Sequence, residues 1–192
     1  MEKFLLIDNG STLTESLAQL LPMRPTTVRF GDIRPASAAG NDCVILSGSS
    51  RLPVVGNESA FESEITLIRE SAVPIIGICL GAELIGHAFG GMLRDLGEKR
   101  KGLVDITSTD KEKVLLENGR HFSVYEAHQW ALETVPENFK ILAESDHGPE
   151  IIKHVSRPIW GLQFHPEHLT ESTLGDEIFM RILNHSLAAR KI

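Results

Sequence analysis

The sequence predicts a single α/β domain in which helices cover both faces of an open, mostly parallel central sheet. Three observations support this. Apolar runs of strand length alternate with helical patterns in the first half of the chain, and these runs are continuously apolar. Strand patterns dominate the second half. The first two observations indicate parallel strands buried on both faces, and the third indicates antiparallel strands added in the C-terminal half. A length of 192 residues suits one domain, 1–192, with its own core.

Strands and helices are expected to alternate along the first half. Residues 3–7 (KFLLI) form an apolar run that stops at a polar loop, which is typical of a buried strand. Leucines at helical spacing in residues 12–21 predict a helix that ends before Pro22. The same patterns predict further strands at 26–30, 42–46 and 73–78, and further helices at 59–71 and 80–89.

The second half consists mainly of strand patterns. Since few helical segments separate them, hairpins are expected there rather than crossover connections. An amphipathic pattern at 174–189 predicts a closing helix. Apolar and β-branched runs predict strands at 104–108, 120–126, 140–144, 150–155 and 158–164.

Composition and charge exclude several classes of function. The formal net charge of −7 argues against nucleic-acid binding, which needs a basic face. The N-terminal apolar run is too short for a signal peptide and no run approaches a membrane span, so no membrane association is expected. Two cysteines, Cys43 and Cys79, make no disulfide framework, and a reducing, cytoplasmic location is therefore expected.

Ligand sites in open α/β sheets lie beyond the carboxyl ends of the strands. Four such ends carry polar or reactive side chains. They are the loops at 8–11 and 47–50, Cys79, and the segment His165-Pro166-Glu167.

Cys79 lies in a G-x-C-x-G pattern between a predicted strand and a predicted helix, as in a nucleophile elbow. Gly77 and Gly81 supply the room that so sharp a turn requires. The N-terminus of the following helix favours thiolate over thiol, and the N–H of Leu80 can donate to an oxyanion. The alternative is a buried structural cysteine, which is our interpretation of Cys43 inside its apolar strand.

A thiolate nucleophile needs a base, and the base needs an orienting group. His165 directly follows a strand pattern, as Cys79 does, and Glu167 lies two residues on. Glu167 can accept from one ring nitrogen while the other faces the sulfur. His168 completes an H-P-E-H sequence, but this lacks the helical frame of known zinc motifs, so no metal is expected.

The segments GICLGAE (77–83) and QFHPE (163–167) together resemble the class I, triad-type glutamine amidotransferases. Residues 7–11 and 44–48 resemble the first strand and the oxyanion strand of that family, so that the likeness covers nearly the whole chain. It implies a flavodoxin-like fold. A stand-alone chain of this size is similar to the separate amidotransferase subunit of GMP synthase, as found in archaea, and residues 134–143 fit that branch.

The resemblance implies a reaction. Cys79 attacks the side-chain amide of L-glutamine, and His165, oriented by Glu167, protonates the departing ammonia. The N–H groups of Gly48 and Leu80 hold the oxyanion. The products are glutamate and ammonia.

The resemblance also implies binding partners. No cofactor is expected. A partner synthase, of the ATP-pyrophosphatase type if the pathway is GMP synthesis, would receive the ammonia. The residues assigned to substrate binding are Glu83, Ala127, His128 and Gln129.

Three departures from the family pattern keep alternatives open. Glu83 stands where the family has Gln, Ser49 where it often has Gly, and residues 127–130 read AHQW. A stand-alone γ-glutamyl hydrolase, a subunit of another synthase such as the anthranilate type, and a non-catalytic regulatory homologue are the alternatives.

Overall fold

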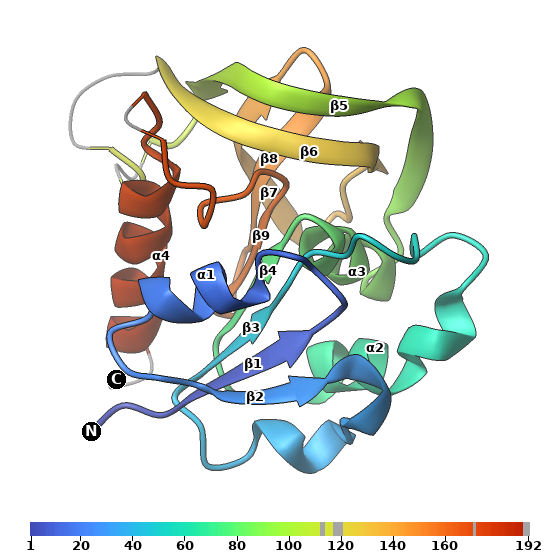
Figure 1. Cartoon of the computed structure of the whole chain (residues 1–192), viewed down its shortest axis with the longest axis vertical. Coiled ribbons are helices and arrows are strands. Elements are labelled where there is room, and N and C mark those ends of the chain that lie inside the picture. Colours follow the sequence, from blue (N-terminus) through green and yellow to red (C-terminus); the bar gives the residue numbers. More distant parts are fainter. Residues whose placement is uncertain (112–113, 117–120, 171, 190–192) are drawn as a thin grey trace.

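A nine-stranded sheet runs through the part of the chain that the computed structural model describes, residues 1–111, 114–116, 121–170 and 172–189 (Figure 1). Its strand order is β2-β1-β3-β4-β9-β8-β7-β5-β6. The strands are β1 (Phe4–Asp8), β2 (Thr26–Arg29), β3 (Cys43–Leu46), β4 (Ile75–Ile78), β5 (Met92–Ser108), β6 (His121–Thr134), β7 (Phe139–Ser145), β8 (Gly148–His154) and β9 (Ile159–Leu162).

The sheet changes character between its two halves, as the sequence predicts. Strands β2, β1, β3, β4 and β9 are parallel neighbours, whereas β8, β7, β5 and β6 join in antiparallel pairs. Every residue of β3, β4 and β9 is buried, which explains their uninterrupted apolar runs. The parallel order also places β9, from late in the chain, directly beside β4.

Helices cover both faces of the parallel half (Figure 1). α1 and α4 pack on one face, and α2 and α3 pack on the other. Successive residues of β1 pack into the hydrophobic cores on opposite faces of the sheet. Phe4 and Leu6 face α1 and α4, and Leu5 and Ile7 face α2 and α3. The helices are α1 (Thr14–Leu20), α2 (Glu62–Glu70), α3 (Leu80–Ala88) and α4 (Gly175–Ala189), with short 3-10 turns η1 (Phe30–Asp32), η2 (Pro35–Ala38) and η3 (Glu58–Phe61).

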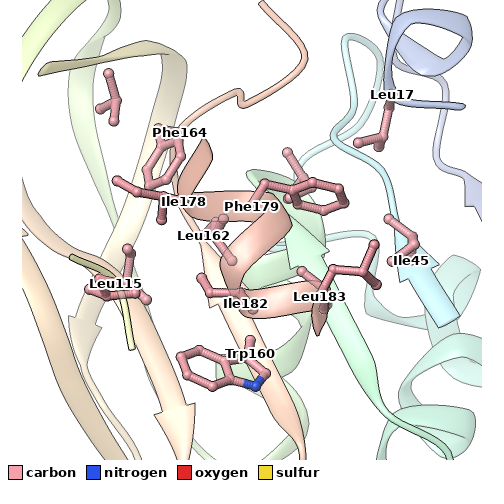
Figure 2. Packing of buried hydrophobic residues seen from close by; sticks show 14 of the residues in the cluster. Leu17, Ile45, Leu115, Trp160, Leu162, Phe164, Ile178, Phe179, Ile182 and Leu183 are labelled. Atoms are coloured by element: carbon pink, nitrogen blue, oxygen red, sulfur yellow. The ribbon is translucent and has the colours of Figure 1, made fainter. Parts of the chain in front are cut away.

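The core beneath α4 anchors the segment that follows β9. Figure 2 shows Phe164 and Leu162 against Ile178 and Ile182 of this helix, with Trp160 further along β9. All five side chains are buried. Full burial of such a side chain stabilises the fold by about 1.5–3 kcal/mol. The backbone around His165 is therefore held by hydrophobic packing on its N-terminal side.

The hairpin of β5 and β6 is much longer than expected. The predicted strands at 104–108 and 120–126 are the far ends of β5 and β6; residue 120 itself lies outside the described residues. Residues 92–103 and 127–134 were not predicted to be strand. Within them, 97–102 was interpreted as a solvated charge run and 127–130 as a loop, and both interpretations were wrong, since these residues belong to β5 and β6. The charged stretch RDLGEKRK pairs with β6 around an irregularity between Asp95 and Arg100. Its exposed face tolerates charge, so the pattern that marks a buried strand is missing.

Within the described residues, no helix has the length and hydropathy needed to cross a membrane.

Candidate active site

The strand order brings three distant segments to one edge of the sheet. Gly48 follows β3, Cys79 follows β4 and His165 follows β9, and these strands are parallel neighbours. A methyl group placed on Gly48 would lie 3.1 Å from Cε1 of His165 and 3.4 Å from Cβ of Cys79. The side chains of Cys79 and His165 therefore both lie next to Gly48, as expected if the three residues form one site.

Cys79 occupies the strained turn expected of a nucleophile elbow. Its φ of 51° makes it the one non-glycine residue with positive φ among those described. The turn is held by the backbone, since the N–H of Cys79 donates to the carbonyl of Leu162 at 2.7 Å and α3 begins at the next residue. A Cβ on Gly77 would lie 2.4 Å from the Gly81 carbonyl group, so both glycines are needed for close packing.

Backbone and side chain together hold the His165 ring. The backbone N–H of His165 donates to the carbonyl of Tyr125 on β6 at 2.8 Å. The Nδ1 atom lies 2.8 Å from Oε1 of Glu167, and both side chains are buried. Because a carboxylate accepts, this contact places the proton on Nδ1 and leaves Nε2 as the basic nitrogen.

A network that the sequence analysis missed fixes the loop of Gly48. Asn9 donates from its backbone N–H to Oγ of Ser47 at 2.9 Å and from Nδ2 to the carbonyl of Ser47 at 3.0 Å. The same Nδ2 donates to Oε1 of the buried Glu64 at 3.1 Å. The polar loop at 8–11 was the available signal, but nothing in the sequence showed that Glu64 of α2 reaches it.

A cleft of about 350 Å³ opens over Cys79. All four residues predicted to bind substrate line it: Glu83, Ala127, His128 and Gln129. Gly48, His165 and Glu167 are not among its lining residues. Further lining residues are Ser49, Ser50, Arg51, Leu52, Pro53, Leu80, Asp95, Lys99 and Trp130.

The cleft contains charged groups that the sequence analysis did not assign to substrate binding. Arg51 and Lys99 bring positive charge, and Asp95 brings negative charge. Lys99 lies in residues 98–102, which the sequence analysis placed near the cleft rim if a partner exists and otherwise interpreted as part of a solvated charge run. Asp95 lies outside that run. Asp95 Oδ1 accepts from Nε2 of Gln129 at 3.0 Å, which ties β5 to β6 at the cleft rim.

Ser49, one of the departures from the family pattern, has a local structural role. Its Oγ accepts from the backbone N–H groups of Arg51 at 3.1 Å and Leu52 at 3.2 Å. Such a turn satisfies the backbone of the loop that forms one cleft wall.

Burial dominates the electrostatics around the sulfur. It raises the pKa of the Cys79 thiol, and the nearby carboxyl groups of Glu83 and Glu167 raise it further. The N–H of Leu80 acts in the opposite direction. The expected stabilisation of thiolate by the helix end is therefore outweighed, and the thiol needs a base to lose its proton.

Glu83 lies under the sulfur, inside the site. It is 3% exposed, and burial raises its pKa to about 7, opposed first by a hydrogen bond from Gln163. Nε2 of Gln163 donates to Oε1 of Glu83 at 3.3 Å. Glu83 therefore does not point into solvent.

An elbow cysteine, a histidine held by a carboxylate and a doubly wound sheet are the arrangement expected of a class I amidotransferase. The chain matches the family model for class-I glutamine amidotransferases over residues 5–184 and belongs to that family. It is thus a glutamine amidotransferase.

Known relatives of similar length carry one name. The chain is 38% identical over 146 residues to a glutamine-hydrolysing GMP synthase subunit from Pyrococcus abyssi, covering 74% of this chain and 73% of that one. It is 34% identical over 172 residues to the subunit of the same name from Pyrococcus furiosus, covering 85% and 88%. A Thermoplasma acidophilum crystal structure, described as that of a candidate GMP synthase subunit, superposes with a TM-score of 0.87 at 26% identity, covering 100% and 96%.

Proposed function

We propose that this chain hydrolyses the side-chain amide of L-glutamine with Cys79, His165 and Glu167 and delivers the ammonia to a partner synthase in GMP synthesis. The observation that carries the proposal is the convergence of Gly48, Cys79 and His165 at the ends of three adjacent parallel strands. The order of the proton transfers follows from the position of the proton on Nδ1 of His165, which leaves Nε2 as the base.

Nε2 of His165 removes the proton from the Cys79 thiol as sulfur attacks the amide carbon. The charge on Glu167, 2.8 Å from Nδ1, stabilises the imidazolium that results. The N–H groups of Gly48 and Leu80 stabilise the oxyanion. The imidazolium then protonates the leaving nitrogen, ammonia departs and a thioester remains. His165 activates water to release glutamate and regenerate the thiol.

The cleft fits the two charged groups of a free amino acid. Arg51 and Lys99 supply positive charge for an α-carboxylate, and Asp95 supplies negative charge for an α-ammonium group. A substrate held between them can reach Cys79 with its side chain, since all four residues line one cleft. An amide of glutamine length is the substrate that this arrangement favours.

A partner is proposed because free ammonia is largely protonated in water and then no longer a nucleophile. Three groups of residues line the cleft and form the surface on which a partner could dock. They are residues 49–53, Asp95 with Lys99, and residues 127–130. The names of the similar archaeal subunits support a synthase of the ATP-pyrophosphatase type.

The test is a glutaminase assay with and without such a synthase. Purified chain is expected to release glutamate slowly alone and faster with an archaeal GMP synthase subunit of the ATP-pyrophosphatase type and its nucleotide substrate. Diazo-oxo-norleucine, an electrophilic mimic of glutamine, is expected to label one residue, Cys79. Rapid unaided cleavage of γ-glutamyl peptides would identify a stand-alone hydrolase instead, and absence of labelling would identify a non-catalytic homologue.

Replacement of Glu83 by Gln is expected to increase kcat/KM for glutamine about fivefold at pH 8, equivalent to ~1 kcal/mol. The carboxylate of Glu83 raises the pKa of the Cys79 thiol and repels the substrate carboxylate. With a pKa of about 7, Glu83 is ionised in roughly one tenth of molecules at pH 6 and about nine tenths at pH 8. The ratio of variant to wild-type kcat/KM should therefore rise as the pH passes through 7.

The matched control is Glu133→Gln, an exposed glutamate of β6, which should leave the pH profile unchanged. Equal or lower activity of Glu83→Gln across this pH range would contradict the assigned role of Glu83.

A further inference from the structure

A second cluster of titratable side chains lies on β6 and the β7–β8 hairpin, and one of its members, His128, lines the cleft. Figure 1 shows the ribbons of these strands. Glu126 and His128 lie two residues apart on β6 and therefore point to the same face. His147 lies in the turn before β8, and Glu150 lies on β8. We call these four residues the β6 cluster. Glu126, His128 and Glu150 are buried and His147 is partly buried.

The spacing of the nitrogen and oxygen atoms matches the edges of a metal tetrahedron. Oε2 of Glu126 lies 3.2 Å from Nε2 of His128 and 2.9 Å from Nδ1 of His147. One atom from each of these residues lies within 4.8 Å of the others. Zinc bonds of about 2.0–2.2 Å to nitrogen and oxygen require separations of roughly 3.3 Å between neighbouring ligand atoms. The three side chains need little movement to share one ion.

The tautomer of His128 points to a ligand on its other nitrogen. Its Nδ1 lies 2.9 Å from the carbonyl oxygen of Trp130, which can only accept, so the proton resides on Nδ1. Nε2 is buried and makes no hydrogen bond, although Oε2 of Glu126 lies 3.2 Å away. An imidazole that donates to a backbone carbonyl and presents its other lone pair inward is the usual form of a metal-binding histidine.

Glu150 lies beside this trio, on β8. Its Oε1 accepts from Oγ of Ser145 at 2.7 Å, which orients the carboxyl group, while Oε2 is buried and accepts no hydrogen bond. Oε1 of Glu126 is also buried and makes no hydrogen bond. Two buried carboxyl groups in contact are costly unless a proton or a cation lies between them.

We propose that Glu126, His128 and His147 bind one Zn²⁺ ion. Two imidazoles and carboxylate oxygens are a ligand set that suits Zn²⁺ better than Mg²⁺ or Ca²⁺. The ion would join β6 to the β7–β8 hairpin and fix His128 in the cleft wall. The sequence analysis weighed a metal only at His165 and His168 and expected none. It did not consider the present ligands as a set, because they come from β6 and the β7–β8 hairpin, whose proximity only folding creates.

The test measures binding and does not depend on glutaminase activity. Chelator-treated protein is titrated with Zn²⁺ against a chromophoric competitor, and zinc content is measured after dialysis. One equivalent is expected to bind. His147→Ala and the isosteric Glu126→Gln should each weaken binding about 100-fold or more, since loss even of an outer hydrogen bond costs a metal site 10–100-fold. Co²⁺ should give tetrahedral visible bands without a thiolate charge-transfer band.

Two control variants test whether Zn²⁺ binds at this site and not at other histidine or cysteine side chains. His121→Ala removes an exposed histidine from the same strand and should bind Zn²⁺ as the wild type does. Cys79→Ala removes the active-site sulfur and should also retain the ion. Absence of stoichiometric Zn²⁺ in the wild type, equal affinity in His147→Ala, or loss of the ion in Cys79→Ala would each overturn the proposal. Circular dichroism of each variant confirms that it is folded.

Discussion

Glutamine hydrolysis is expected to fall by about 10⁴-fold or more in kcat when Cys79 is replaced by alanine. The loss follows because no other nucleophile lines the strained turn at the end of β4. Alanine fits the space that cysteine occupies, so the fold should be retained. The measurement is glutamate release at saturating glutamine, together with labelling by diazo-oxo-norleucine and a thermal melt.

Cys43→Ala is the matched control. That thiol is also fully buried, but it lies inside β3, and burial raises its pKa above the range in which a thiolate forms. The control variant should keep wild-type turnover and labelling, with only a stability loss from the small cavity. If Cys79→Ala retained more than a small fraction of wild-type turnover, the sulfur would not be the nucleophile, and the proposed mechanism would fail.

Replacement of Gly77 by alanine is expected to destabilise the protein by about 3 kcal/mol, which lowers Tm by roughly 10 °C for a chain of this size. The added Cβ would lie 2.4 Å from backbone C and O of Gly81 and 2.8 Å from backbone N of Ala82. These atoms belong to the first turn of α3, which can move only by shifting the helix away from β4. The displaced helix would carry Leu80 with it, so activity should fall together with stability.

Gly31→Ala provides the control for the loss of a glycine. A Cβ at that position meets no atom within 4 Å, and its φ is not in the left-handed region. Its effect on the free energy of unfolding should stay within about 0.5 kcal/mol. Similar melting temperatures for the Gly77 and Gly31 variants would show that the elbow is not the tightly packed turn described above.

Prediction from sequence succeeded where the local pattern and the burial agree. Residues 73–78 and 80–89 were assigned correctly because β4 is buried throughout and α3 is buried along nearly its whole length. It failed for most of β5 and for the second half of β6. β5 and β6 pair with each other as a two-stranded antiparallel ribbon with an exposed face. Neither strand therefore needs the continuous apolar run by which a buried strand is recognised.

The candidate site also has features that the sequence predicted and features that only the structure showed. The elbow around Cys79 is a local feature of strand, glycine and helix, and five residues suffice to identify it. The pair His165 and Glu167 is local too, since two residues separate them. The network of Asn9 with Glu64 and the β6 cluster was not found, because their members come from segments far apart in the chain.

The amino-acid order was enough to predict the class of fold, the strained turn at Cys79 and the pairing of His165 with Glu167. Each depends on periodicity or on close spacing, which a sequence displays directly. The position of β9 beside β4, and hence the meeting of His165 with Cys79, became known only from the folded chain, because strand order depends on packing between distant segments. The same holds for the charge state at the sulfur. Solvent exclusion by neighbouring elements, which no local pattern encodes, keeps the Cys79 thiol protonated until a base removes its proton.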